Sequence, residues 1–354
     1  MIKIAQNQQI ILSFFLNNEE LSSSDVYNKL LESKSEVSLV TVKRELTELK
    51  SLNLLALSGA GRSIVYSIST KGRIYSNLNA HEYCNIEPDK RIGLKSYNFD
   101  LFNHINEDIF LDFEIDELNK ATEIYKNNIK SISNTLEEKE LERFIIELSW
   151  KSSKIEGNTY TLLDTEKLIS KGIEAEGHNK LEASMILNHK YAFKKIRENI
   201  HEFMNIKLSV IEEIHKILIK DLNIDHGLRN KAVGVTGSIY RPLDNIHQIK
   251  EAIETLCEIV NKMKSPYSKA LVMLLGLSYI QPFEDGNKRT SRLIANSILL
   301  AHGFAPLSYR SVDENEYKEA ILVFYELNSL ISFKKIFIEQ YIFAAKNYAV
   351  IAKS

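Results

Sequence analysis

Two apolar stretches, residues 270–280 and 293–300, are separated by one short polar run. The run reads Gln-Pro-Phe-Glu-Asp-Gly-Asn-Lys-Arg-Thr-Ser-Arg over residues 281–292. A proline and a glycine punctuate the change from apolar to polar, so this pattern predicts two buried helices joined by a tight loop. Carboxylate, amide and guanidinium groups crowd into that loop. Such a turn suits a metal-bound polyphosphate.

Long amphipathic patterns dominate the rest of the chain, and only 13 glycines and 5 prolines interrupt its 354 residues. We therefore expect a mainly α protein of two or three units. The formal net charge of -2 excludes a global attraction to nucleic acid or membrane. The start of the chain does not resemble a secretion signal, and no apolar stretch reaches the roughly 18 residues of a membrane span. The two cysteines, Cys84 and Cys257, fit buried positions in a reduced, cytoplasmic compartment.

The first 75 residues carry the pattern of a small separate domain. Apolar residues at helical spacing predict three helices, the second beginning near Ser24 and the third near Ser38. Two β-prone runs around the turn at residues 58–62 predict a hairpin. Three helices followed by a hairpin resemble a winged helix-turn-helix domain.

That resemblance implies contacts to duplex DNA from the third helix and the wing. The candidate residues are Thr41, Lys43, Arg44 and Arg62. Nine basic and seven acidic residues give this region a net charge of only +2, which is low for a DNA-binding domain. Two alternatives therefore stay open, namely DNA binding and a winged helix used for protein contacts or for a homodimer.

Residues 76–135 form a connector in which we find no candidate catalytic or ligand-binding residues. A predicted helix follows at about residues 138–156. Ser152 and Glu156 lie along one edge of this helix, because residues four apart stack on a helix surface. Gly157 supplies a natural C-terminal cap.

The run at residues 281–292 resembles the signature of the Fic-domain family of protein adenylyltransferases and related phosphotransferases. Two positions differ, since Gln281 replaces the signature histidine and Lys288 replaces its second glycine. Residues 152–157 are similar to the family's inhibitory motif, and residues 233–242 resemble its β-hairpin flap, which aligns the target segment. The resemblance implies a Fic-type helical core with a short β-hairpin flap at residues 136–354, preceded by the winged helix-turn-helix domain at residues 1–75.

The resemblance also implies roles for individual residues. Asp285 would bind Mg²⁺, and the phosphates of ATP would meet residues at the start of the second helix, where Asn287 would contact the α-phosphate and Arg289 the distal phosphates. Glu156 would pair with Arg292 and block the γ-phosphate position. The implied phosphate-binding set is Gly286, Asn287, Lys288, Arg289 and Arg292; the inhibitory set is Ser152, Glu156 and Gly157; the flap set is Val235, Gly237, Ser238 and Tyr240.

Gln281 limits the functional prediction. In the family the histidine accepts the proton of the attacking hydroxyl, whereas an amide is not basic near neutral pH. His247 and His302 are poorly placed along the chain to replace it. We therefore expect an autoinhibited, nucleotide-binding Fic-fold protein with weakened or altered transfer to an unknown target protein. Two alternatives stay open, namely a catalytically inactive, ATP-sensing, DNA-binding regulator and a protein-only scaffold.

Overall fold

The computed structural model describes residues 4–17, 20–33, 37–105 and 109–351. The chain divides into two compact units, and neither is continuous in sequence. The smaller unit contains residues 1–106, 234–241 and 319–334, and the larger unit contains residues 107–233, 242–318 and 335–354. None of the helices in the described ranges has the length and apolarity that crossing a lipid bilayer requires.

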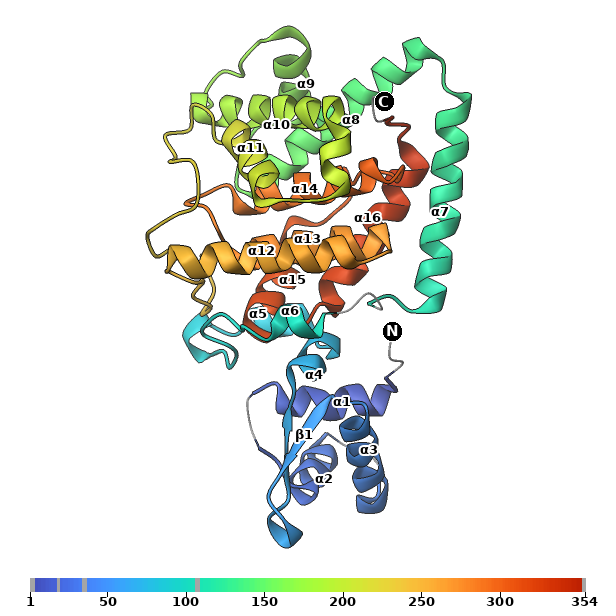
Figure 1. Ribbon diagram of the computed structural model, residues 1–354, viewed down its shortest axis with the longest axis vertical. Helices are drawn as coiled ribbons and strands as arrows, with labels where there is room; N and C mark the ends of the chain where they lie inside the picture. The colour runs from blue at the N-terminus through green and yellow to red at the C-terminus, as the bar shows by residue number, and fades with distance from the viewer. Residues whose placement is uncertain (1–3, 18–19, 34–36, 106–108, 352–354) are drawn as a thin grey trace. The chain divides into compact units, whose positions relative to one another are not determined.

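The smaller unit begins with three helices and a hairpin (Figure 1). Ser38 caps the third helix as predicted, while the second helix is capped by Ser22 rather than Ser24, because the Ser22 hydroxyl accepts a bond from the amide of Asp25. The elements of this unit are α1 Gln6–Phe15, α2 Ser23–Glu32, α3 Leu39–Ser51, β1 Leu55–Ser58, η1 Gly61–Ser63, β2 Val65–Ile68, α4 Thr70–Tyr75, α5 Ala80–Cys84, η2 Pro88–Lys90 and α6 Leu101–His104.

Strands β1 and β2 pair antiparallel, with Leu55 opposite Ile68 and Ser58 opposite Val65. Apolar residues of α1, α2 and α3 close the core of this region, and Phe15, Val26 and Leu46 are fully buried there. The winged helix-turn-helix prediction is therefore confirmed in its element order and its hairpin.

Within its described residues, the larger unit consists of helices and loops without a strand. Its elements are α7 Asp112–Ser131, α8 Asn134–Ile155, α9 Leu162–Lys171, α10 Lys180–Glu198, η3 Ile200–Met204, α11 Leu208–Leu218, α12 Ile246–Lys262, α13 Pro266–Ile280 and α14 Asn287–Ala301. Two further helices, α15 Glu314–Leu327 and α16 Ile331–Asn347, carry residues of both units.

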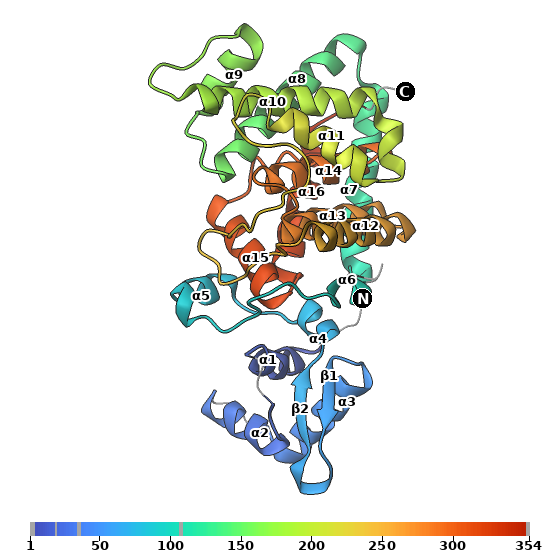
Figure 2. The same ribbon diagram turned by 60° about the vertical axis from the view of Figure 1, so that its left-hand side comes forward.

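Helices α13 and α14 form the centre of the larger unit (Figures 1 and 2). Apart from its first residue, α13 is buried along its whole length, as its mostly apolar sequence predicts. Helix α14 packs against α13 and also contacts α8, α10, η3 and α11. This arrangement fixes the start of α14 and the loop before it, where the predicted site lies.

Candidate functional site

The loop at residues 281–286 joins α13 to α14, as the sequence predicts. Gln281 ends α13 in the left-handed region, with φ of 51°, and Gly286 precedes α14 with φ of 80°. A β-carbon at Gly286 would also lie 3.3 Å from Cγ2 of Ile219. Glycine therefore suits this turn because of its backbone angle, and any side chain here would press against Ile219.

The side chains of Gln281 and Asn287 bind the loop itself. Nδ2 of Asn287 donates to Oε1 of Gln281 at 3.0 Å and to the carbonyl of Phe283 at 2.9 Å, and its Oδ1 accepts from the Phe283 amide. Nε2 of Gln281 donates to the carbonyl of Ser278 at 2.6 Å. Both side-chain amides are buried, so in this conformation they stabilise the loop. Both Nδ2 hydrogens of Asn287 are used in these bonds.

Arg289 lies buried at the start of α14, with 2% of its side chain exposed. Its Nη2 lies 3.5 Å from Oδ2 of Asp285, and within the described residues its Nη1 has no hydrogen-bond partner. Burial lowers the pKa of Arg289, and the Asp285 carboxylate opposes that shift. A buried donor without a partner is uncommon, and the first amides of a helix also lack internal acceptors. Both features suit an anion at this helix end.

Asp285 is the only predicted metal ligand. Its side chain is 67% exposed, and its Oδ1 accepts a bond from the amide of Gly286 at 2.6 Å. No group of three or more His, Cys, Asp or Glu residues in the described part of the chain could hold a metal ion. A divalent cation would therefore have to share Asp285 with phosphate oxygens, an arrangement that Mg²⁺ accepts.

Helix α8 brings the predicted inhibitory residues to α14. It ends at Ile155, and Gly157 follows with φ of 97°. Nη2 of Arg292 donates to Oε1 of Glu156 and to the carbonyl of Ser152, both at 2.8 Å, and its Nε donates to the Ser152 hydroxyl at 2.8 Å. Arg292 has no exposed side-chain surface. The predicted pairing of Glu156 with Arg292 is present.

Lys288 adds a contact to Glu156 that the sequence did not predict. Its Nζ lies 3.0 Å from Oε2 of Glu156, so each carboxylate oxygen has its own cation. Burial alone would raise the pKa of Glu156. Arg292 and Lys288 outweigh burial and lower that pKa from 4.5 to about 2. Glu156 therefore stays ionised at any physiological pH.

This shift predicts a pH-dependent stability. The pKa of Glu156 is lower in the folded state, so its stabilisation is complete above about pH 4.5 and is lost as the pH falls toward 2. We expect Glu156→Gln to reduce the free energy of unfolding by roughly 3 kcal/mol near neutral pH, and by much less near pH 3. Urea denaturation of both proteins at the two pH values measures this. Glu123→Gln, at an exposed surface pair, is the control. An equal loss at both pH values would contradict the prediction.

Two buried histidines near the loop escaped the sequence analysis. Nε2 of His189 lies 3.1 Å from the Ser152 hydroxyl, and the His215 ring stacks on Phe283 with centroids 3.7 Å apart. Burial, reinforced by Arg289 and Arg292, lowers the pKa of His189 well below its usual value. Burial also lowers the pKa of His215 to about 4. Both rings are therefore neutral, and a lone histidine on an apolar helix face offers no sequence signal of such a position.

Nε2 of His215 lies 2.9 Å from the carbonyl of Asp285 and donates to it, so this ring supports the loop. Nε of Arg229 donates to the carbonyl of Gln281 at 2.6 Å, and the amide of Arg229 donates to the carbonyl of Pro282. The loop is thus held from two sides by residues outside the motif. His302 binds the carbonyl of Ile298 at the far end of α14, and His247 is exposed at the start of α12.

The predicted flap departs from a β-hairpin. Residues 234–241 contain no strand, and the amide of Ser238 closes a turn on the carbonyl of Val235 around Gly237. Two of its other amides bind segments outside the flap, since Ile239 donates to a carboxylate oxygen of Glu326 and Arg241 donates to the carbonyl of Lys95. Tyr240 is buried. The flap residues pack within the smaller unit.

The candidate DNA contacts lie on and after α3. Lys43 and Arg44 are exposed, and Thr41 is partly exposed and donates its amide to the Ser38 cap. Arg44 pairs with Glu45 at 3.0 Å. The side chain of Arg62 lies outside the described residues.

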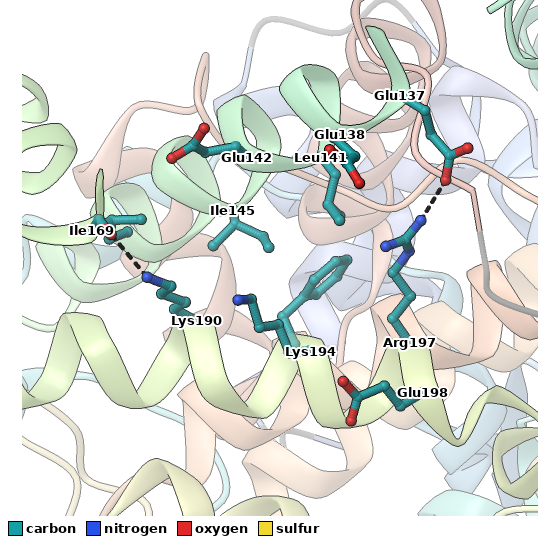
Figure 3. Close-up of a pocket in the computed structure, with 11 residues that line it drawn as sticks. Glu137, Glu138, Leu141, Glu142, Ile145, Ile169, Lys190, Lys194, Arg197 and Glu198 are labelled. Carbon is teal, nitrogen blue, oxygen red and sulfur yellow. Dashed lines mark hydrogen bonds and ion pairs between the residues drawn. The ribbon is translucent and has the colours of Figure 1, made fainter. Parts of the chain in front are cut away.

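A cavity of about 600 Å³ lies between α8, α9 and α10, away from the motif (Figure 3). Its rim carries four carboxylates, from Glu137, Glu138, Glu142 and Glu198. Two of its three cations already have partners, since Lys190 donates to the carbonyl of Ile169 and Arg197 pairs with Glu137. Four carboxylates repel a polyphosphate, so this cavity is a poor nucleotide site.

The N-terminal region and the core match two different protein families. Residues 1–104 match the Ferric uptake regulator family, and residues 205–299 match the Fic/DOC family. Protein adenylyltransferase Fic of Nematostella vectensis is 30% identical over 174 residues, which are 48% of this chain and 41% of that protein. The Drosophila yakuba protein of the same name is 28% identical over 171 residues, 48% of this chain and 34% of that protein. The chain thus spans less than half of these relatives.

Two solved structures have a similar fold. Fic-1 from C. elegans aligns with a TM-score of 0.56 and 20% identity, covering 67% of this chain and 71% of that one. A Fic domain containing signaling protein from Bacteroides thetaiotaomicron gives the same two values, covering 65% of this chain and 94% of that one. The motif and the helix pair that carries it lie within residues 205–299, which match the Fic/DOC family, and the solved structures show that the fold resembles that of Fic proteins.

Proposed function

We propose that the chain binds ATP at the start of α14 and is a self-inhibited adenylyltransferase whose transfer of AMP to a protein hydroxyl is slow. The observation that carries this proposal is Arg289, a buried guanidinium beside the first amides of α14 whose Nη1 has no partner among the residues that the structure describes. A triphosphate would supply the missing acceptors. The curated relatives with the name protein adenylyltransferase support the choice of reaction.

In the proposed reaction the target hydroxyl oxygen attacks the α-phosphorus, and a P–O bond to AMP forms as the bond to pyrophosphate breaks. The hydroxyl proton must leave. Gln281 can orient the hydroxyl with its amide but cannot carry the proton away. Mg²⁺, when bound through Asp285, would neutralise phosphate charge. Arg289 would hold the distal phosphates.

Glu156 would inhibit the enzyme. Its carboxylate occupies Arg292 and Lys288, the two cations that would otherwise face the γ-phosphate. Lys288 stands where the family signature has glycine, so this chain has a second contact that holds the inhibitory carboxylate in place. An incoming phosphate must displace both ion pairs, which disfavours a productive pose.

A calorimetric titration with ATP and Mg²⁺ tests the proposal. We expect Glu156→Gly to bind ATP about tenfold more tightly than the wild type, because one freed charge-assisted contact contributes about 1.5–3 kcal/mol. Glu314→Gln is the matched control. Glu314, on α15, pairs with Lys151 of α8, the helix that Glu156 follows, but contacts neither Arg292 nor Lys288. Absence of binding by Glu156→Gly to any purine triphosphate would refute the proposal.

The second candidate is an inactive, ATP-sensing regulator that binds DNA. The exposed basic residues Lys43 and Arg44 on α3, together with the match to the Ferric uptake regulator family, favour it. Both candidates predict ATP binding. Transfer activity separates them.

A further inference from the structure

A buried carboxylate in the smaller unit joins two distant segments of the chain. Glu326, near the end of α15, has no exposed side-chain surface. Its Oε1 accepts from Nη1 of Arg91 at 3.1 Å and from the hydroxyl of Ser238 at 2.7 Å, and its Oε2 accepts from the hydroxyl of Tyr83 at 2.8 Å. The amide of Ile239 lies 3.3 Å from the same Oε1. We call these five residues the Glu326 cluster.

The cluster is tightly packed on the side of Tyr83 and Arg91. The amide of Leu94 donates to the backbone carbonyl of Glu326 at 2.6 Å. A β-carbon at Gly93 would lie 2.7 Å from that carbonyl oxygen and 3.0 Å from the Tyr83 hydroxyl, so only glycine fits between them. Burial raises the pKa of Tyr83 well above its usual value, and the Glu326 carboxylate is the second cause of this shift. The tyrosine therefore remains a hydrogen-bond donor.

The flap depends on this cluster for its shape. Residues 234–241 have no strand partner among themselves, and two of their amides bind elsewhere, Ile239 to Glu326 and Arg241 to the carbonyl of Lys95. The hydroxyl of Ser238 donates to Glu326 and accepts from the amide of Tyr240 at 3.1 Å. Residues 83–96 and Glu326 thus supply the bonds that a second strand supplies in a hairpin.

We propose that Tyr83 and Arg91 are positioning residues for the flap and act on it through Glu326. The inference rests on the proposed function and on the family resemblance, which implies that residues 233–242 align the target protein. Arg91 neutralises the buried carboxylate, Tyr83 fixes its second oxygen, and the remaining lone pairs of Glu326 orient Ser238 and Ile239. The segment that follows the winged helix region therefore sets the conformation of the target-binding flap.

Amide hydrogen exchange of the full-length protein tests this. Tyr83→Phe removes one hydrogen bond to Glu326 that comes from residues 83–96. Ser238→Ala removes one that comes from the flap. We expect each to raise exchange at the Ile239 and Arg241 amides about tenfold, while the paired strands β1 and β2 are unchanged. His81→Gln is the control, because His81 bonds Glu319 of α15 at 2.9 Å but does not contact the cluster.

The double variant separates positioning from general support. Tyr83 and Ser238 bind different oxygens of one carboxylate, so their effects on flap exchange should be less than multiplicative when combined. Independent effects, no change at the flap, or an equal rise in the β1 and β2 amides would each overturn the inference. ATP calorimetry on the same variants tests the proposed function separately, because the cluster lies outside residues 281–292 and ATP affinity should be unchanged.

Discussion

Replacing Gln281 with histidine in a Glu156→Gly background is expected to raise AMP transfer by about two to four orders of magnitude, the usual contribution of a general base. Glu156→Gly alone should bind ATP and transfer little, because freeing the phosphate site does not provide an acceptor for the hydroxyl proton. The imidazole would provide one near neutral pH.

The loop should tolerate this change. The Gln281 side chain bonds to Ser278 and to Asn287, and an imidazole can keep one of these bonds through a ring nitrogen. The backbone there is also supported from outside, since Arg229 binds the Gln281 carbonyl. Loss of the bond to Asn287 frees one amide hydrogen for the contact with the α-phosphate that the family resemblance implies for Asn287. The substitution would therefore restore a base and release a phosphate ligand together.

The measurement is transfer of label from α-labelled ATP to proteins of a lysate and to the enzyme itself. Gln281→Asn in the same background is the matched control, because it keeps an amide and should show no gain. If Glu156→Gly is already fully active and histidine adds nothing, another base exists and the interpretation of position 281 is wrong. If the double variant binds ATP without any transfer, the DNA-binding regulator becomes the better candidate.

Local patterns predicted the parts of this site that lie on one element. The helix, loop and helix around residues 281–286 follow from an apolar-to-polar change marked by Pro282 and Gly286. The Ser38 cap and the wing hairpin follow from similar short-range signals. The pairing of Glu156 with Arg292 came from a resemblance, because no periodicity relates residues 136 positions apart.

The remaining features arise from long-range contacts between segments. Lys288 reaches Glu156 only because α8 packs against α14, and the sequence around either residue carries no sign of it. The flap was expected as a hairpin because residues 233–242 resemble the β-hairpin flap of the Fic family. Its Ile239 and Arg241 amides bind Glu326 and Lys95 instead of a second strand. Residues 233–242 carry no sequence signal of these distant acceptors. The neutral rings of His189 and His215 depend in the same way on burial by distant helices.

Arg289→Met is expected to weaken ATP binding by about a hundredfold, since a buried guanidinium gives a phosphate one or two charge-assisted bonds of about 1.5–3 kcal/mol each. The same substitution should leave thermal stability unchanged or raise it. The cation is 2% exposed, its Nη1 has no partner among the described residues, and its 3.5 Å contact with the exposed Asp285 offsets little of the cost of burial.

Opposite signs for affinity and stability distinguish this interpretation from a structural ion pair. If Arg289 served mainly to hold Asp285, the methionine variant would lose stability and keep its nucleotide affinity. Calorimetric ATP titration in the Glu156→Gly background and thermal unfolding without nucleotide measure the two effects. Arg310→Met is the control, because Arg310 pairs with Glu147 while 44% of its side chain stays exposed. Under the proposed function, Arg289 is a buried charge retained for a polyphosphate, and the protein without nucleotide would be equally or more stable without that charge.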